Sequence, residues 1–255
     1  MKLHFSHAHG LVLLVISIAL LWNSVMNAQQ STVLSFSKAK KELRKIYKRN
    51  PVTLYCACKV DKTLRKPYLS TCSYKPRKSL KRAKRIEWEH VVPAHAFGQS
   101  FKEWREGHRD CVTQSGKAYK GRKCASKVNT QYRRMEADMH NLFPAIGEVN
   151  GDRSNYSMAI LPGEPRLYGK CDVEIVNRKI EPRSAVRGDI ARTYFYMESS
   201  YPGRGIISKK NRKLFEAWSK EDPVDSWECE RARLIQKVQT RPNNIVLSSC
   251  REAGL

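Results

Sequence analysis

A glutamate and a histidine stand side by side at Glu89 and His90, within IEWEHVVPAHAFG at residues 86–98. A carboxylate can ligate a metal ion, and a neutral imidazole can take a proton from water. Hydrolysis of a phosphodiester can use both actions. A dense basic run, Lys75–Arg85, precedes the pair and would attract a polyanionic substrate. A single Glu-His pair often lies on a protein surface and has no function. A hydrolytic role therefore depends on what other residues the chain supplies.

A second group of polar residues lies in EADMHNLFPAIGEVNGD, the segment Glu136–Asp152. Apolar residues lie between its carboxylates and amides, so we do not expect the segment to be fully exposed to solvent. Hard oxygen ligands of this kind suit Mg²⁺ or Ca²⁺ better than zinc. The alternative is that the Asn and Asp residues of NGD only cap a turn and a helix.

EWEHVVPA, MEADMHNL, GEVNGDRSN and DPVDSWECER occur in this order in the chain. Together they resemble bacterial endonuclease I, a family of periplasmic or secreted nucleases, and the resemblance extends from about Tyr55 to Cys250. It implies an α+β fold in which a ββα-metal (His-Me finger) core is embedded in a mostly helical, disulfide-bonded single domain. It also implies Mg²⁺ as the cofactor, with Ca²⁺ or Mn²⁺ as substitutes, and products that carry 5′-phosphates.

The resemblance carries specific roles over to positions of this sequence. They are a general base at His90, metal ligands at Glu89 and Asn150, an arginine on the scissile phosphate at Arg109, and supporting residues at Glu136 and Asn141. The sequence departs from the family pattern at His95, where tryptophan is common, and at Glu103, where cysteine is frequent. An insert around Lys117–Lys123 also changes the surroundings of Arg109.

Successive side chains of a regular strand point to opposite faces. Glu89 and His90 can therefore share one site only if their strand ends or bends at this point. The following residues, Val91-Val92-Pro93, permit such an end.

The chain has eight cysteines, an even number: Cys56, Cys58, Cys72, Cys111, Cys124, Cys171, Cys229 and Cys250. In an exported protein such a set predicts a disulfide framework. Sequence separation favours the pairs Cys111–Cys124 and Cys229–Cys250. Zinc ligation is the alternative, but no Cys-x2-Cys spacing occurs.

Residues 1–28 are predicted to form a secretory signal, because LVLLVISIALLW at residues 11–22 is too short to span a bilayer and matches the apolar region of such a signal. An uncleaved interfacial anchor is the alternative. The chain carries 48 Lys and Arg against 24 Asp and Glu, a net charge of +24, and removal of the signal with its Lys2 leaves 24 − 1 = +23. Such a surplus favours nucleic acid as partner. An anionic membrane surface, or no dedicated partner, are the alternatives.

Periodicity predicts helices over Ser37–Arg49, Arg187–Ser199, Lys209–Ser219 and Ser226–Gln239, and strands over Val52–Lys59 and Arg85–Val92. No linker or repeat divides residues 29–255. We therefore expect one α+β domain with helices concentrated in its last third, monomeric and without stable membrane insertion.

These observations predict a periplasmic or secreted Mg²⁺-dependent endonuclease that cleaves DNA and RNA with little sequence specificity. A catalytically silent, secreted nucleic-acid-binding or uptake protein would keep the basic surface without needing Glu89, His90 and Asn150 together. A zinc hydrolase using His90, His95 and His140 is a third candidate, although its histidine spacing is not that of helical zinc proteases.

Overall fold

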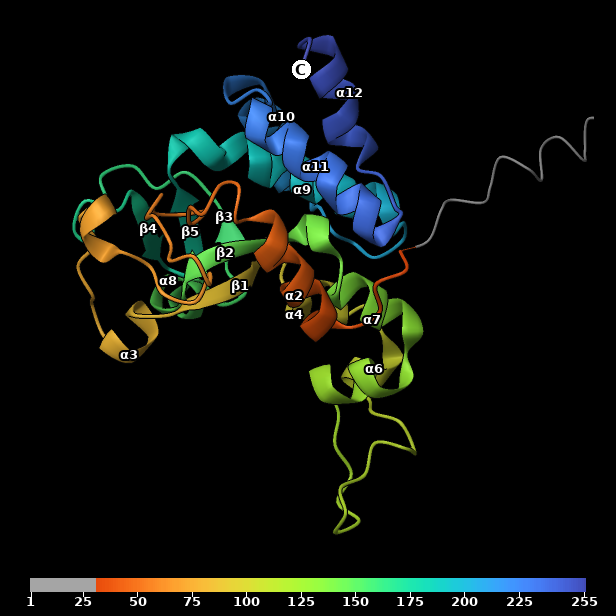
Figure 1. The fold of residues 1–255 in the computed structure, drawn as a ribbon. Helices are drawn as coiled ribbons and strands as arrows, with labels where there is room; N and C mark the ends of the chain where they lie inside the picture. Colours follow the sequence, from red (N-terminus) through yellow and green to blue (C-terminus); the bar gives the residue numbers. More distant parts are fainter. Residues whose placement is uncertain (1–30) are drawn as a thin grey trace, which may run out of the picture.

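The computed structural model describes residues 31–255, and the signal predicted at residues 1–28 lies outside them. The described chain combines helices with short strands, which confirms the predicted α+β class. Figure 1 shows the C-terminal helices gathered above the strands, and a long loop extending from the opposite end of the molecule. Within residues 31–255, no helix has the length and apolar character needed to cross a membrane.

Two short strands and the helix that follows them form the unit around the Glu89-His90 pair. Strand β1 (Ile86–His90) pairs antiparallel with β2 (Leu142–Ile146), and His90 lies opposite Leu142. Helix α8 (Gly147–Arg153) begins directly after β2 and packs against β1. The strand predicted over Arg85–Val92 is confirmed, and it ends at His90 as the shared site requires.

The strand predicted over Val52–Lys59 is wrong. Its two ends meet each other in an isolated bridge, because the chain folds back between them. Thr53 N–H donates to the carbonyl of Cys58 at 2.9 Å, and Ala57 takes a left-handed conformation with φ of 53°. The apolar alternation that suggested a strand belongs to a tight loop whose cysteines face inward.

Four disulfides link the eight cysteines, and no cysteine is free. The two predicted pairs, Cys111–Cys124 and Cys229–Cys250, are both confirmed. The other two pairs are Cys56–Cys171 and Cys58–Cys72. Because every thiol is consumed in a disulfide, the alternative of zinc ligation by cysteine does not apply to this fold.

Helix α2 (Phe36–Ile46) is the first described element. The Ser35 hydroxyl caps it by accepting from the backbone N–H of Lys38 at 3.4 Å. Its apolar face, Ala39, Leu43 and Ile46, is buried in the core. The helix predicted over residues 37–49 is therefore confirmed, with an earlier end.

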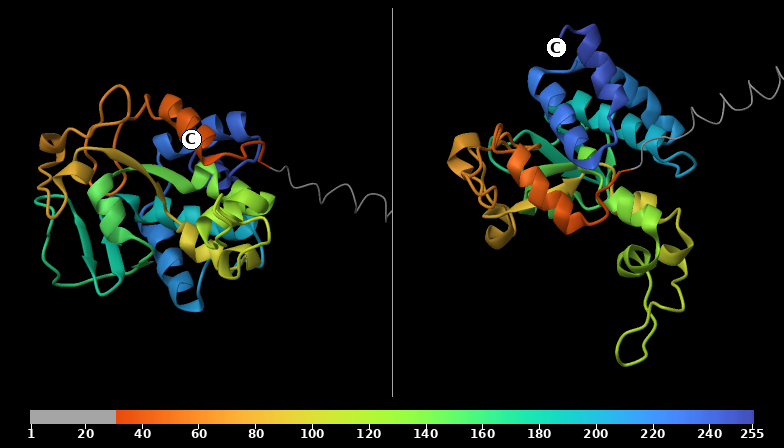
Figure 2. Two further views of the ribbon diagram at one scale, coloured as in Figure 1. Left: turned by 90° about the horizontal axis from the view of Figure 1, so that it is seen from below. Right: turned by 45° about the vertical axis from the view of Figure 1, so that its right-hand side comes forward.

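The last third of the chain is helical, as predicted: α9 (Arg187–Ser200), α10 (Lys209–Glu221), α11 (Ser226–Gln239) and α12 (Asn244–Glu252). The first three correspond to predicted helices, and α12 was not predicted. Tyr194 of α9 stacks on Phe215 of α10 with ring centroids 4.3 Å apart. The right-hand view of Figure 2 shows these helices gathered at one end of the molecule.

The remaining elements are short. A three-stranded sheet has the order β3 (Ser157–Met158), β5 (Lys179–Pro182), β4 (Val173–Val176). The short α-helices are α3 (Leu80–Ala83), α4 (Ala94–Gly98), α5 (Lys102–Arg105), α6 (Arg122–Val128) and α7 (Thr130–Glu136). The 3₁₀ turns are η1 (Leu69–Cys72), η2 (Met139–Asn141) and η3 (Ser184–Val186). Residues 106–121, between α5 and α6, form the loop that extends from the body in Figure 1.

Candidate active site

A cavity of about 720 Å³ opens beside β1 and brings together residues from five parts of the chain. Glu89 and His90 line it from β1, and Asn150 lines it from α8. The register of the hairpin accounts for this meeting, because β2 passes directly into α8 and carries Asn150 to the side of β1. The cavity is also lined by Phe36, Lys40, Arg44, Ile86, Glu87, Trp88, Pro93, Ala94, His95, Trp104, Arg122, Arg153, Ser154 and Asn155.

His90 is held in one tautomer by a backbone carbonyl. Its Nε2 lies 2.9 Å from the carbonyl oxygen of Glu136, which can only accept, so Nε2 carries the proton and Nδ1 keeps a lone pair. Phe36 packs against the imidazole with ring centroids 5.0 Å apart. Burial, together with the nearby charge of Arg122, lowers the pKa of His90 to about 3. The imidazole is therefore neutral at physiological pH and able to accept a proton.

Glu89 is buried, with only one of its oxygens engaged. The Tyr55 hydroxyl donates to Oε1 at 2.7 Å, and Arg153 Nη1 lies 3.1 Å from the same oxygen. Burial raises the pKa of Glu89, while the Arg153 charge and the Tyr55 hydrogen bond lower it. The second oxygen, Oε2, has no hydrogen-bond partner among residues 31–255 and belongs to a residue that lines the cavity.

Arg153 also fixes the end of β1. Its guanidinium donates to the carbonyl of His90 at 2.9 Å and to that of Val91 at 2.6 Å. These bonds hold the backbone where the strand ends. One buried arginine thus orients both the carboxylate of Glu89 and the peptide that carries His90.

Asn150 is oriented by a neighbouring carboxylate. Its Nδ2 donates to Glu87 Oε2 at 2.8 Å, which leaves Oδ1 as the free atom of the amide. Glu87 is in turn held by Arg82 and Arg85, each at 2.6 Å. Although burial raises the pKa of Glu87, the hydrogen bonds from Arg82, Arg85 and Asn150 lower it below its ordinary value.

The free oxygens of Glu89 and Asn150 are donors of the kind that Mg²⁺ prefers. Mg²⁺ usually takes one or two protein oxygens and keeps several waters, and a cavity of this size leaves room for them. Within residues 31–255, no cluster of three or more His, Cys, Asp or Glu residues could cage a metal ion. The donor set is therefore suited to a metal shared with substrate and water, not to a closed structural site.

Arg122, at the first position of α6, is a cation of this cavity that the sequence analysis did not single out. Its Nε donates to Glu136 Oε1 at 2.5 Å, and its Cζ lies 5.3 Å from the centre of the Phe36 ring. Glu136 therefore holds Arg122 with its carboxylate and His90 with its carbonyl. The Ser126 hydroxyl donates to the other carboxylate oxygen at 2.9 Å.

Asn141 lies behind the site and clamps the chain after His90. Its Oδ1 accepts from the N–H of Val92 at 2.7 Å, and its Nδ2 donates to the Val92 carbonyl at 2.9 Å. Asn141 is fully buried and does not line the cavity. Both predicted supporting residues thus contact the segment or the side chain of His90.

The structure does not bring Arg109 to this cavity. Its side chain is 89% exposed on the extended loop and lines a separate hollow of about 470 Å³ together with Tyr119 and Lys120. Nor are the three histidines of the zinc alternative brought together. His95 lines the cavity, but His140 is fully buried and packs on Tyr196 with ring centroids 4.7 Å apart.

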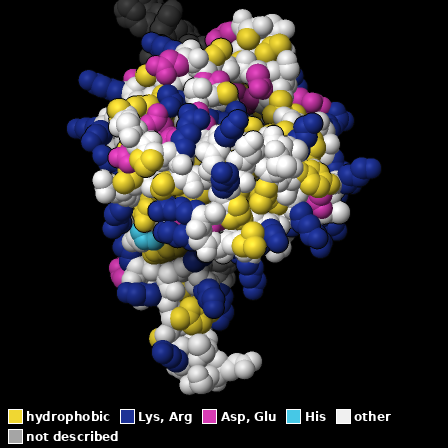
Figure 3. Space-filling view, turned by 90° about the vertical axis from the view of Figure 1, so that its left-hand side faces the viewer, with side chains coloured by type: hydrophobic (Ala, Val, Ile, Leu, Met, Phe, Trp, Pro, Cys, Tyr) yellow, Lys and Arg dark blue, Asp and Glu magenta, His cyan; other side chains and the backbone are white. Residues whose placement is uncertain are grey.

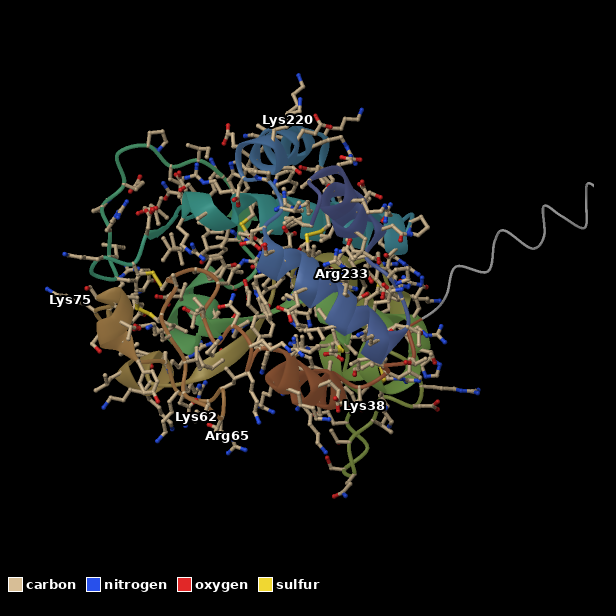
Figure 4. All side chains as sticks on the ribbon, turned by 45° about the horizontal axis from the view of Figure 1, so that its top comes forward. Lys38, Lys62, Arg65, Lys75, Lys220 and Arg233 are labelled. Carbon is tan, nitrogen blue, oxygen red and sulfur yellow. A yellow bond between two sulfur atoms is a disulfide. The ribbon has the colours of Figure 1, made fainter. Side chains whose placement is uncertain are left out.

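Basic side chains cover much of the surface beyond the cavity. Lys and Arg are spread over the face shown in Figure 3, without being confined to one patch. The labelled Lys62, Lys75 and Lys220 in Figure 4 come from separate segments and project outward. This distribution suits contact with phosphates at many positions.

Comparison with known proteins agrees with this geometry. The family model described as Endonuclease I matches residues 21–249. The chain is 45% identical over 221 residues to an extracellular deoxyribonuclease of Aeromonas hydrophila. The alignment covers 85% of this chain and 90% of that protein. It is 42% identical over 250 residues to a periplasmic deoxyribonuclease of the same species, covering 96% and 98%. It is 43% identical over 226 residues to Endonuclease-1 of Buchnera aphidicola subsp. Acyrthosiphon pisum, covering 87% and 84%. Since the family model spans most of the sequence and the relatives align along nearly their whole lengths, the chain belongs to the endonuclease I family.

Proposed function

We propose that this protein is an exported, Mg²⁺-dependent endonuclease that hydrolyses DNA and RNA with little sequence specificity and leaves 5′-phosphate ends. The proposal rests on one observation: a neutral histidine and two free ligand oxygens line the same cavity. His90 supplies the first, and Glu89 and Asn150 supply the others. The names of the relatives, extracellular and periplasmic deoxyribonucleases, support DNA as substrate and action outside the cytoplasm.

In this proposal β1, β2 and α8 form the ββα-metal core, with the base on the first strand and the amide ligand on the helix. The unbroken passage from β2 into α8 supports the assignment. The Tyr55 and Arg153 contacts on Glu89 fix its carboxylate in place before substrate binds.

His90 acts as the general base. Its Nε2–H is held by the Glu136 carbonyl, so Nδ1 takes the proton from the attacking water. Phe36 and Asn141 keep the imidazole and its backbone in position. Because burial lowers the pKa of His90 to about 3, the base needs no prior deprotonation at neutral pH.

A Mg²⁺ ion held by Glu89 and Asn150 would supply positive charge to the phosphate and to the leaving oxygen. Arg122 adds a second cation, whose guanidinium is held by the Glu136 carboxylate and lies over the Phe36 ring. We assign the contact with the scissile phosphate to Arg122 in place of Arg109, since Arg122 lines the cavity. Arg109 is left with a contact to more distant phosphates through the extended loop.

Lack of sequence specificity follows from the kind of contacts available. The net charge of +24 arises from lysines and arginines scattered along the chain. Contacts with phosphates position a nucleic acid without reading its bases. We therefore expect affinity to depend steeply on salt and little on sequence.

The test is digestion of plasmid DNA and of RNA by the exported protein, with and without EDTA, beside the His90→Ala variant. We expect cleavage that EDTA abolishes and Mg²⁺ restores, and little cleavage by the variant. Binding without cleavage under every condition would favour the nucleic-acid-binding or uptake protein. Restoration by zinc alone would favour a zinc hydrolase.

A further inference from the structure

One face of helix α2 lines the active-site cavity. Phe36, Lys40 and Arg44 follow one another at intervals of four residues, and all three line the cavity. The neighbouring face of the same helix, Ala39, Leu43 and Ile46, is buried in the core. Packing of the apolar face therefore fixes the direction in which the two cations point. Figure 1 shows α2 next to the strand that carries His90.

Among the described residues 31–255, neither cation of this stripe has a carboxylate partner. The ion pairs among residues 31–255 include none to Lys40 or Arg44, whereas Lys45 on another face of α2 pairs with Glu42 at 2.8 Å. Arg44 Nε is buried without a hydrogen-bond partner. Lys40 Nζ lies only over the Phe36 ring, 4.4 Å from its centre. Unpaired cations that line a cavity attract an anionic ligand into it.

The stripe is continuous with the reacting groups. Phe36 carries Lys40 and the Arg122 guanidinium near its ring and packs against His90. Lys40 and then Arg44 lie farther along α2 from Phe36, one helical turn apart. Side chains four residues apart on a helix are separated by about 6 Å along its axis. Successive phosphates of one extended strand have a similar separation.

We propose that the α2 stripe, Phe36, Lys40 and Arg44, is a subsite that binds the phosphates next to the scissile one. Lys40 binds the nearest flanking phosphate, and Arg44 binds the one beyond it. Phe36 contacts both His90 and Lys40 and so positions the two cations relative to His90. The inference rests on the proposed function, because it takes a nucleic-acid strand as the occupant of the cavity.

The experiment compares two double variants of α2 that lose the same charge. Lys40→Gln with Arg44→Gln removes the stripe, and Lys38→Gln with Lys41→Gln removes two exposed cations that do not line the cavity. Binding to a mixed-sequence duplex of about 20 base pairs is measured in EDTA over a range of salt concentrations. Loss of the stripe should raise Kd by about 10- to 60-fold in 0.1 M salt and reduce the log–log salt slope by about 1.8, at 0.9 per phosphate. The control pair should change both quantities much less.

A second comparison locates the contacts. A dinucleotide has one phosphodiester and no flanking phosphates, so the factor by which the stripe variant slows its cleavage should be much smaller than the factor on the long duplex. On the long duplex the same variant should show a raised KM with a smaller change in kcat. Equal weakening by both double variants would mean that only total charge matters. A loss on the dinucleotide as large as the loss on the duplex would place Lys40 or Arg44 at the scissile phosphate. Either result overturns the flanking subsite. Failure of the unmodified protein to cleave DNA would instead overturn the proposed function, and the binding measurement would still test the stripe.

Discussion

Arg153 gives the most direct test of how the site is held together. Its side chain is 1% exposed, lies 3.1 Å from Glu89, and donates to the carbonyls of His90 and Val91. Methionine is similar in length and apolar, so Arg153→Met removes the charge and the hydrogen bonds while largely filling the space. The carboxylate of Glu89 is then left buried with Tyr55 as its remaining partner.

The structure allows the size of the effect to be estimated. Removing one partner of a buried ion pair typically costs about 3–5 kcal/mol, because the remaining charge is left uncompensated. Arg153→Lys is the matched control, since lysine keeps a charge beside Glu89 but cannot reach both carbonyls with one fork. We expect Arg153→Met to lower the free energy of unfolding by about 3–5 kcal/mol near pH 8.

The pH dependence separates the lost charge from the lost hydrogen bonds. Burial already raises the pKa of Glu89, and Arg153 makes the largest opposing contribution. Without Arg153 the folded-state pKa rises further above the unfolded value of about 4.3. The folded protein then binds more protons, so its stability declines as pH rises from the unfolded pKa toward the folded one. The deficit of Arg153→Met should therefore be smaller near pH 5 than near pH 8.

The assay is urea unfolding in EDTA with intact disulfides, near pH 5 and near pH 8, followed by addition of Mg²⁺ at the higher pH. Mg²⁺ beside Glu89 replaces the missing charge and should recover part of the loss, up to about 2.7 kcal/mol at 100 times its Kd. The deficit of Arg153→Lys should vary little with pH. If both variants lose the same stability at both pH values, ionised Glu89 is not what Arg153 stabilises, and this reasoning is refuted.

Three further predictions concern catalysis. His90→Ala should lower kcat by about 10²–10⁴-fold while Kd for DNA stays within several-fold, and an equal loss of binding would make His90 structural. Arg122→Ala should reduce kcat more than Arg109→Ala does, because only Arg122 lines the cavity; steady-state kinetics on duplex DNA with the reverse order would restore the original assignment. Replacing Cys111 and Cys124 by alanine should cost about 3 kcal/mol in urea unfolding and also lower kcat, since the disulfide ends in the helix that starts at Arg122; unchanged kcat would show that Arg122 is held without it.

The helices of the last third could be predicted because each carries a regular apolar face. Ile190, Tyr194 and Met197 repeat at helical spacing and are all buried in α9. Apart from β1, which was predicted within Arg85–Val92, the short elements around the site give no such signal. Strand β2 has the sequence LFPAI, which is apolar throughout and includes Pro144, so it shows no alternation. The alternation at residues 52–59 misled because inward-facing cysteines of a loop imitate a strand face.

The neighbourhood of Glu89, His90 and Asn150 could be anticipated, since family motifs fix both segments and the hairpin register then joins them. The arginine could not be chosen in the same way. Arg-x-Cys occurs twice, at Arg109 and at Arg122, and the two cysteines are bonded to each other. The sequence does not indicate which arginine faces the cavity, whereas the fold does, because Arg122 lines it and Arg109 lines a separate hollow on the extended loop.

The charges around the cavity affect how the proposed metal site, with two protein ligands, would bind its ion. Four cationic side chains line it, Lys40, Arg44, Arg122 and Arg153, against the carboxylates of Glu87 and Glu89, a balance of 4 − 2 = +2. A divalent cation entering alone meets a net positive wall, and Glu89 is already neutralised in part by Arg153. The scissile phosphate of a bound strand carries one negative charge, which lowers this balance to 2 − 1 = +1, and it would add its own oxygens to those of Glu89 and Asn150. Substrate should therefore raise the affinity for Mg²⁺, and by reciprocity Mg²⁺ should raise the affinity for substrate. In the proposed mechanism, the same cations would disfavour a lone metal ion and favour one that binds together with a phosphodiester.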